Sequence, residues 1–190
     1  MEAFRVWATG NLVENRNRGI FAEWLVGQAL GVVDPSVPRK EWDVADLRYQ
    51  ERLIEVKSSG RGQAWLQDKP STLRFDISLQ RQPWDAETNT WLDLEEPRRT
   101  AATYVFCAHG PYPATNNNVA DPSSWQFWVI STKTLDTELG GQKSIGTSRL
   151  GTFTDPVSWG DLRHAVDQAL EGTEPFAGFN TWAIVPVPDV

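Results

Sequence analysis

The sequence predicts a single mixed α/β domain over residues 1–190, with a central mixed β-sheet flanked by helices. An apolar helical segment comes first, several strand-like segments follow, and a second helical segment lies near the C-terminus. The length of 190 residues, with 40% hydrophobic and 23% charged residues, suits one hydrophobic core rather than several domains. We place the main core at about residues 15–130, and a C-terminal helix and edge strand at residues 155–188.

The first predicted element is a helix over residues 19–31. Asn15 or Asn17 can cap its start, and Gly31 can end it in the left-handed conformation. Its residues are apolar over most of the circumference, which predicts burial, and Glu23 is its only charged residue. Glycines recur at every fourth position beside this glutamate, so we expect a neighbouring segment to approach it closely.

Two strand-like segments, residues 42–49 and 52–58, predict a β-hairpin. The second alternates apolar and polar residues, as a half-buried strand does. The numbers of paired residues add up to 101 whether the loop has two residues or four. Gln50-Glu51 is a poor two-residue turn sequence, so we expect the four-residue loop over residues 49–52.

Later segments predict three more strands. Residues 72–78 alternate and complete a three-stranded meander with the hairpin, whereas residues 103–107 and 126–130 are apolar enough for buried strands. Residues 110–124 are rich in Pro and Asn and predict a loop. The turn-rich residues 81–100 predict no helix.

Composition excludes several classes of protein. Cys107 is the only cysteine, which excludes an internal disulfide and a multi-cysteine zinc site and favours a reducing, cytoplasmic location. Apolar runs stop at about a dozen residues, so we expect no membrane span. The net charge is −7, but the first 75 residues carry +1, so any polyanion-binding surface is expected there.

Asp46, Glu55 and Lys57 form the group that suggests chemistry. Glu55 and Lys57 are two residues apart on a strand, so their side chains share a face. In the predicted register Asp46 lies directly opposite Glu55 on that face, with Cβ atoms about 4.5–5.5 Å apart. Two adjacent carboxylates repel each other unless a positive charge lies between them. Lys57 supplies part of that charge, and a divalent cation is the better counter-ion.

Carboxylate oxygens together with water suit Mg²⁺ or Mn²⁺. The Val56 carbonyl lies between the two key side chains, so the candidate metal ligands are Asp46, Glu55 and Val56. Glu23 could ligate through water or hold a second metal. A metal held this way lowers the pKa of a bound water, and Lys57 can orient that water. These groups suit the hydrolysis of a phosphodiester.

A purely structural interpretation is also available, because residues 54–57 fit an ordinary half-buried strand. A Glu-x-Lys sequence arises by chance about once in a chain of this length. The opposed Asp46 favours the metal, because an acid opposite Glu55 is unfavourable in a sheet without a counter-ion. Asp43 is a rival acid, but in the predicted register it faces Ser58 and points away from Glu55.

These residues resemble the PD-(D/E)xK nuclease superfamily, whose members have the restriction-endonuclease-like fold. The resemblance consists of Asp46, the Glu-Val-Lys sequence at residues 55–57 and a preceding helix that bears Glu23, and it covers roughly residues 15–80. The proline that precedes the aspartate in the family motif is absent, and Ala45 stands in its place. The resemblance implies a metal-dependent nuclease.

The resemblance also implies a role for each matching residue. Asp46 and Glu55 would be the metal ligands, and Lys57 the catalytic lysine. Glu23 would be the auxiliary acid, and Gln63 would help to position the site. The substrate implied is nucleic acid, most simply DNA, with Mg²⁺ or Mn²⁺ as cofactor. Candidate nucleic-acid contacts are Arg18, Arg48, Arg61, Ser58 and Ser59.

The competing hypothesis is a non-catalytic interaction module or a tryptophan-rich binding domain. The chain has ten tryptophans. Stacking on bases is one use for them, but packing in the core and at its rim is favoured for most. Trp65, Trp84 and Trp91 are the candidates for stacking. The acidic total charge could be reconciled with a nuclease by a basic cleft or by a partner that delivers the DNA. A homodimer or a protein partner is a separate expectation.

Overall fold

The computed structural model describes residues 1–39, 43–86, 89–176 and 184–185. The helices are α1 (Glu2–Thr9), α2 (Asn15–Leu30), α3 (Asn116–Val119), α4 (Thr132–Leu139), α5 (Thr147–Leu150) and α6 (Leu162–Leu170). The strands are β1 (Leu47–Tyr49), β2 (Arg52–Gly60), β3 (Arg74–Asp76), β4 (Trp84–Asp85), β5 (Thr90–Leu92), β6 (Thr103–His109), β7 (Trp125–Ser131), β8 (Ser144–Gly146) and β9 (Ile184–Val185). Across these ranges no helix combines the length and the apolar character that a membrane crossing requires.

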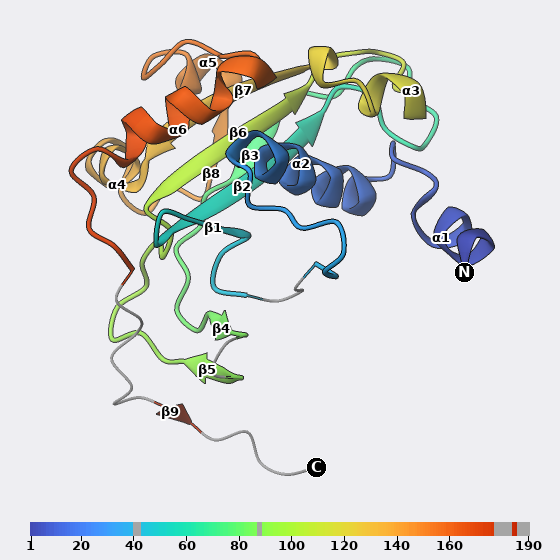
Figure 1. Ribbon diagram of the computed structural model, residues 1–190. Coiled ribbons are helices and arrows are strands. Elements are labelled where there is room, and N and C mark those ends of the chain that lie inside the picture. Colours follow the sequence, from blue (N-terminus) through green and yellow to red (C-terminus); the bar gives the residue numbers. More distant parts are fainter. Residues whose placement is uncertain (40–42, 87–88, 177–183, 186–190) are drawn as a thin grey trace.

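Four strands form the central sheet, in the order β1-β2-β6-β7 (Figure 1). β2 runs parallel to β6, and the two outer pairs are antiparallel. All seven residues of β6 are buried, as expected for a strand that is covered on both faces. The structure therefore confirms a mixed α/β fold built on a mixed sheet with flanking helices.

The sheet has a hydrophobic cluster on each face, and β2 contributes to both. Ile54 and Val56 belong to the first cluster, with residues of α2 and α6, which lie on one side of the sheet (Figure 1). Leu53 belongs to the second cluster, with residues of β3, β8 and α4. Because side chains alternate along a strand, the odd-numbered residues Glu55 and Lys57 belong on the second face.

Helix α2 begins earlier than its apolar pattern predicts, at Asn15. Glu14 caps it, because the carboxylate accepts a hydrogen bond from the Asn17 amide at 3.1 Å. The predicted left-handed C-cap is confirmed at Gly31, whose φ is +74°. The close approach expected beside the glycine stripe occurs at Gly27, where an added Cβ would lie only 2.2 Å from Val33 Cγ2.

The hairpin has the predicted register but not the expected loop. Tyr49 pairs with Arg52, so the loop has only two residues, Gln50 and Glu51. Both have positive φ, +48° and +61°. These angles are those of the primed turn that matches the twist of the strands, although neither residue favours them. The expectation of a four-residue loop was wrong.

The expected three-stranded meander is also wrong, because β3 lies outside the central sheet. It pairs with β8 in a separate two-stranded sheet, where Phe75 faces Ile145. The apolar β6 takes the place beside β2, since that position is buried and β3 exposes Arg74 and Asp76. The late edge strand was predicted over residues 182–187, of which the structure describes only β9, paired with β5. Residue 42, the first residue of the predicted hairpin, also lies outside the described residues.

Candidate active site

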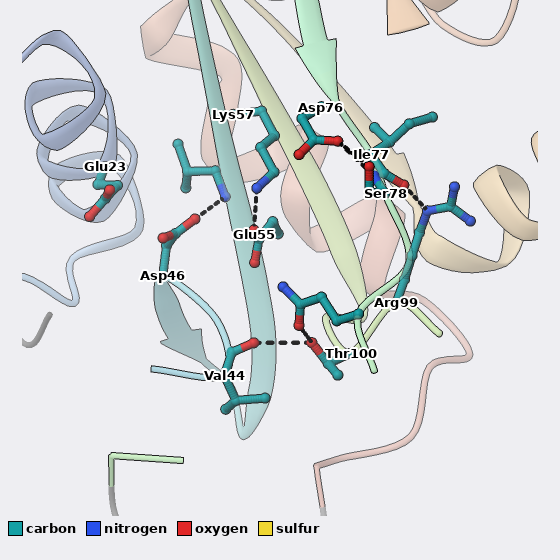
Figure 2. Close-up of polar contacts among 12 residues, drawn as sticks. Glu23, Val44, Asp46, Glu55, Lys57, Asp76, Ile77, Ser78, Arg99 and Thr100 are labelled. Carbon is teal, nitrogen blue, oxygen red and sulfur yellow. Dashed lines mark hydrogen bonds and ion pairs between the residues drawn. The ribbon is translucent and has the colours of Figure 1, made fainter. Parts of the chain in front are cut away.

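Glu55 and Lys57 point to the same side of β2 (Figure 2). The Lys57 Nζ donates to Glu55 Oε1 at 2.5 Å, and Glu55 is only 6% exposed. The pair lies on the face of the second hydrophobic cluster, where the Glu55 side chain is 8% exposed and the Lys57 side chain 28%. The predicted juxtaposition of acid and amine on one face is therefore present.

Asp46 reaches the same part of β2 from its open edge. The ladder between β1 and β2 ends at the pair Leu47 and Ile54. One residue further, the Asp46 carboxylate takes the place of a main-chain partner: its Oδ2 accepts a hydrogen bond from the Val56 amide at 2.7 Å (Figure 2). The N–H and C=O of one strand residue point to the same edge, so the Val56 carbonyl also belongs on the Asp46 side.

The electrostatics show that the acids of the site influence one another. Burial raises the pKa of Glu55 to about 7, with a further contribution from the Asp46 charge, against the opposing effect of Lys57. Burial also raises the pKa of Asp46, while the Val56 amide and Lys57 oppose that rise. Burial alone would lower the pKa of Lys57, but the Glu55 and Asp46 carboxylates raise it overall. Burial therefore opposes the ionisation of both carboxylates, and Lys57 favours it.

Glu23 belongs to α2 and lies across from Asp46, and both residues line a pocket of about 600 Å³. Burial raises the pKa of Glu23, and the Asp46 charge adds to this rise. The Arg39 guanidinium makes two hydrogen bonds to the Glu23 carboxylate, one of them from Nη2 at 2.8 Å. Apolar side chains such as Trp24 and Val33 form much of the rest of the pocket wall. The pocket gives a ligand of small-molecule size a route to Asp46.

Asp76 is a member of the cluster that the sequence analysis missed. It extends from β3 towards Lys57 (Figure 2). Burial alone would raise the pKa of this aspartate, but hydrogen bonds from Ser78 and, to a smaller extent, the Lys57 charge lower it overall. The alternation of residues 72–78 puts Asp76 on the other face of the strand from the buried Phe75. That pattern was the one sign in the sequence of where Asp76 points. What sequence could not supply was the packing of β3 over β2.

Asp46, Glu55 and the Val56 carbonyl are the oxygen donors available to Mg²⁺ in this site. Among the described residues, no group of three His, Cys, Asp or Glu side chains is close enough to hold a metal ion. Mg²⁺ does not require one, because it is commonly held by one or two carboxylates and several waters. Asp46 and Glu55, electrostatically coupled and on either side of the Val56 main chain, fit that need. Glu23 is occupied by Arg39 instead.

Gln63 and Arg18 lie together in a different part of the molecule. The Gln63 side-chain amide donates to the Gly60 carbonyl at 2.8 Å, and its Oε1 accepts from Arg18 at 3.3 Å. Arg18 is 3% exposed and donates to the carbonyls of Val13 and Gly62 as well. Both side chains therefore clamp the end of β2 to the start of α2, and Arg18 has no surface for a nucleic acid.

The other candidate contacts are dispersed. Ser59 Oγ accepts from the Arg74 amide, and the Ser58 hydroxyl is buried without a hydrogen-bond partner among the described residues. Arg48 lies at the 600 Å³ pocket with its guanidinium 3.9 Å from Asp43, the rival acid. Arg61 is exposed at the end of β2 nearest Gln63. Of this set, Arg48 lies at the pocket that Asp46 lines.

The described tryptophans are less buried than the packing argument predicts, since Trp7, Trp24, Trp65 and Trp91 are exposed. Trp125 and Trp128 are buried in the two clusters. Trp84 and Trp91 pack edge to face, with ring centroids 5.2 Å apart, and Trp65 is 58% exposed. Trp24, which was not singled out, is 44% exposed beside Glu23.

Comparison with known proteins gives no family assignment. No protein-family model, curated protein or solved structure matches this chain. The chemistry of the site must therefore be argued from its own residues.

Proposed function

We propose that this protein is a metal-dependent nuclease that hydrolyses phosphodiester bonds, with DNA as the favoured substrate. The observation that carries the proposal is the meeting of Asp46, Glu55 and Lys57 around the Val56 main chain. The proposal includes a restriction-endonuclease-like arrangement of the core and a cytoplasmic location, where the buried, free Cys107 stays reduced.

Each residue has a distinct task in this proposal. Asp46 and Glu55, with the Val56 carbonyl, would hold Mg²⁺, which supplies an activated water and stabilises charge on the phosphate. Lys57 would orient the attacking water and stabilise the negative charge that develops on the phosphoryl oxygens. The new bond joins the water oxygen to phosphorus, and the bond from phosphorus to the leaving sugar oxygen breaks. The attacking water gives up one proton to the surrounding solvent, and the leaving sugar oxygen takes one up from it, so the protons balance.

The central prediction concerns Lys57→Ala. We expect this variant to lose Mg²⁺-dependent cleavage of linear DNA, by at least about a hundredfold, because the charge beside the developing oxyanion is gone. Gel assays of linear DNA with Mg²⁺ measure the rate, and circular dichroism checks that the variant folds. Lys69→Ala removes an exposed lysine and is the matched control. Cleavage by Lys57→Ala at the wild-type rate would remove the catalytic assignment.

Metal binding separates the nuclease from a non-catalytic module. Calorimetric titration with Mn²⁺ should show binding to the wild-type protein, with affinity lowered at least about tenfold in Asp46→Asn. Asp43→Asn is the control, since Asp43 Oδ1 accepts from the Val44 amide rather than meeting Glu55. Absence of Mn²⁺ binding at millimolar concentration, or binding unchanged in Asp46→Asn, would favour the interaction module.

A further inference from the structure

A second pocket, of about 410 Å³, lies at the end of the sheet where β2 and β6 begin and β7 ends. Its lining includes a higher proportion of basic residues than the chain as a whole, which has net charge −7. The charged residues of the lining are Arg52, Arg98, Arg99, Lys133 and Glu174. Its remaining polar lining consists largely of the threonines at positions 100, 132 and 173.

Three of the four cations are not neutralised by a carboxylate within the described ranges. Arg52 donates to the carbonyls of Gln50 and Thr173 and to the Thr173 hydroxyl, which leaves its charge uncompensated. Arg98 and Lys133 are exposed, and no described carboxylate forms an ion pair with either.

Arg99 is different from the other three cations. Its side chain is fully buried and bonded to Asp136 and to the Ile77 carbonyl, so it stabilises the pocket floor rather than offering donors. Allowing for Glu174, the pocket therefore keeps an excess of positive charge. Such a concave basic site attracts an anion.

The pocket is close to the candidate active site. Arg52 and Glu55 are three residues apart on β2, about 10 Å along the strand, and their side chains leave opposite faces of it. Thr100, which lines the pocket, donates to the Val44 carbonyl two residues before Asp46 (Figure 2). A single strand that leaves the active site would have to pass over this end of the sheet to reach the pocket.

We propose that this basic pocket binds a phosphate group, and that the phosphate belongs to the nucleic-acid strand that continues from the active site. The second half of this statement rests on the proposed function, whereas the first half does not. Arg98 and Lys133 donate to the phosphate oxygens, and Arg52 adds charge at the pocket wall. The pocket gives an acidic protein a local surface for a polyanion.

Binding without metal tests this inference separately from cleavage. The full chain is titrated in EDTA with a short, labelled single-stranded DNA, read by fluorescence anisotropy, and with inorganic phosphate, read by calorimetry. Lys133→Glu and Arg98→Glu should each weaken both interactions at least about tenfold. Arg5→Glu changes the net charge equally on exposed helix α1 and should have less than about a twofold effect.

The salt dependence gives a second readout. Loss of one phosphate contact should lower the slope of log K against log salt by about 0.7 for a single strand. A loss of phosphate binding in Lys133→Glu with unchanged DNA binding would overturn the strand assignment and leave free phosphate as the ligand. Equal weakening by Arg5→Glu, or no effect of the pocket variants on either probe, would overturn the proposal that this pocket binds phosphate. Selective loss of binding by the pocket variants in EDTA, together with no Mg²⁺-dependent cleavage by the wild-type protein, would refute only the nuclease.

Discussion

Glu55 is a carboxylate that folding removes from water, and the groups around it determine its behaviour. Its pKa of about 7 arises from burial first and from the Asp46 charge second. Lys57 limits the rise but does not cancel it. A buried acid with a pKa near 7 is a common feature of functional sites, because burial of an ionisable group destabilises the fold while a shifted pKa serves catalysis.

The pKa of Glu55 predicts a pH-dependent stability. The folded-state pKa lies above the ordinary value of 4.5, so between these two values the folded protein binds more protons than the unfolded chain. In EDTA, the free energy of unfolding should therefore fall as the pH rises from about 4.5 to 7, by up to roughly 3 kcal/mol. Urea unfolding across this range measures it.

Glu55→Gln should flatten this dependence, because the titrating group is gone. Glu95→Gln changes an exposed glutamate and serves as the control. A fall in stability that persists unchanged in Glu55→Gln would show that another group causes it.

Arg18 provides a second test with a single residue. Gly60 leaves room for its guanidinium, since an added Cβ would lie 2.8 Å from Arg18 Cζ. Arg18→Ala should lower the free energy of unfolding by about 2–4 kcal/mol, because buried carbonyls lose their donors. Arg16→Ala, at an exposed position two residues away, should change it by less than about 1 kcal/mol. Denaturant unfolding compares the two variants, and equal effects would contradict a clamp by Arg18.

The hairpin of β1 and β2 is the element on which the site depends. Its register brings Asp46 to the Val56 amide. The turn has two residues in the left-handed region, Gln50 and Glu51. The element is therefore held in register by the strands and the surrounding packing, against the local preference of its turn.

Glu51→Gly should remove the conformational cost of the positive φ at this position. Glycine adopts positive φ readily, so we expect the free energy of unfolding to rise by about 1 kcal/mol. Glu51→Ala removes the same side chain without relieving the backbone and should give no increase. Guanidinium unfolding midpoints measure both variants, and a Glu51→Ala variant as stable as Glu51→Gly would assign the effect to the side chain.

The molecule as a whole is a central sheet whose two faces are packed against different kinds of element. Helices α2 and α6 cover one face, and the small β3-β8 sheet with α4 and α5 covers the other. Helix α1 takes no part in either cover and lies apart from the sheet (Figure 1). Its large side chains are exposed, Phe4 by 60% and Trp7 by 84%.

Removal of residues 1–9 should therefore leave the fold intact. None of the residues of α1 is buried, so we expect the free energy of unfolding to change by less than about 1 kcal/mol. Thermal unfolding monitored at a wavelength that reports the sheet measures this. A large loss of stability would mean that α1 packs against the body of the protein in solution.

Local patterns were enough to identify much of this arrangement. The alternation of residues 52–58 predicted β2, and apolar content predicted β6 and β7. Gly31 predicted the end of α2. The helix α4 was missed, since its eight polar-rich residues, capped by Ser131, carry little periodic signal. Whether the acids and Lys57 act as a catalytic site stays a prediction.

The sequence was sufficient for the hairpin register and for the shared face of Glu55 and Lys57, because both follow from the period of a strand. It was not sufficient for the partner of β2, the position of Asp76 or the burial of Arg18. Those depend on which distant segments pack together, and a short segment such as β3 has no local pattern that distinguishes one neighbour from another. The raised pKa of Glu55 likewise comes from packing, since only the folded chain removes that carboxylate from water.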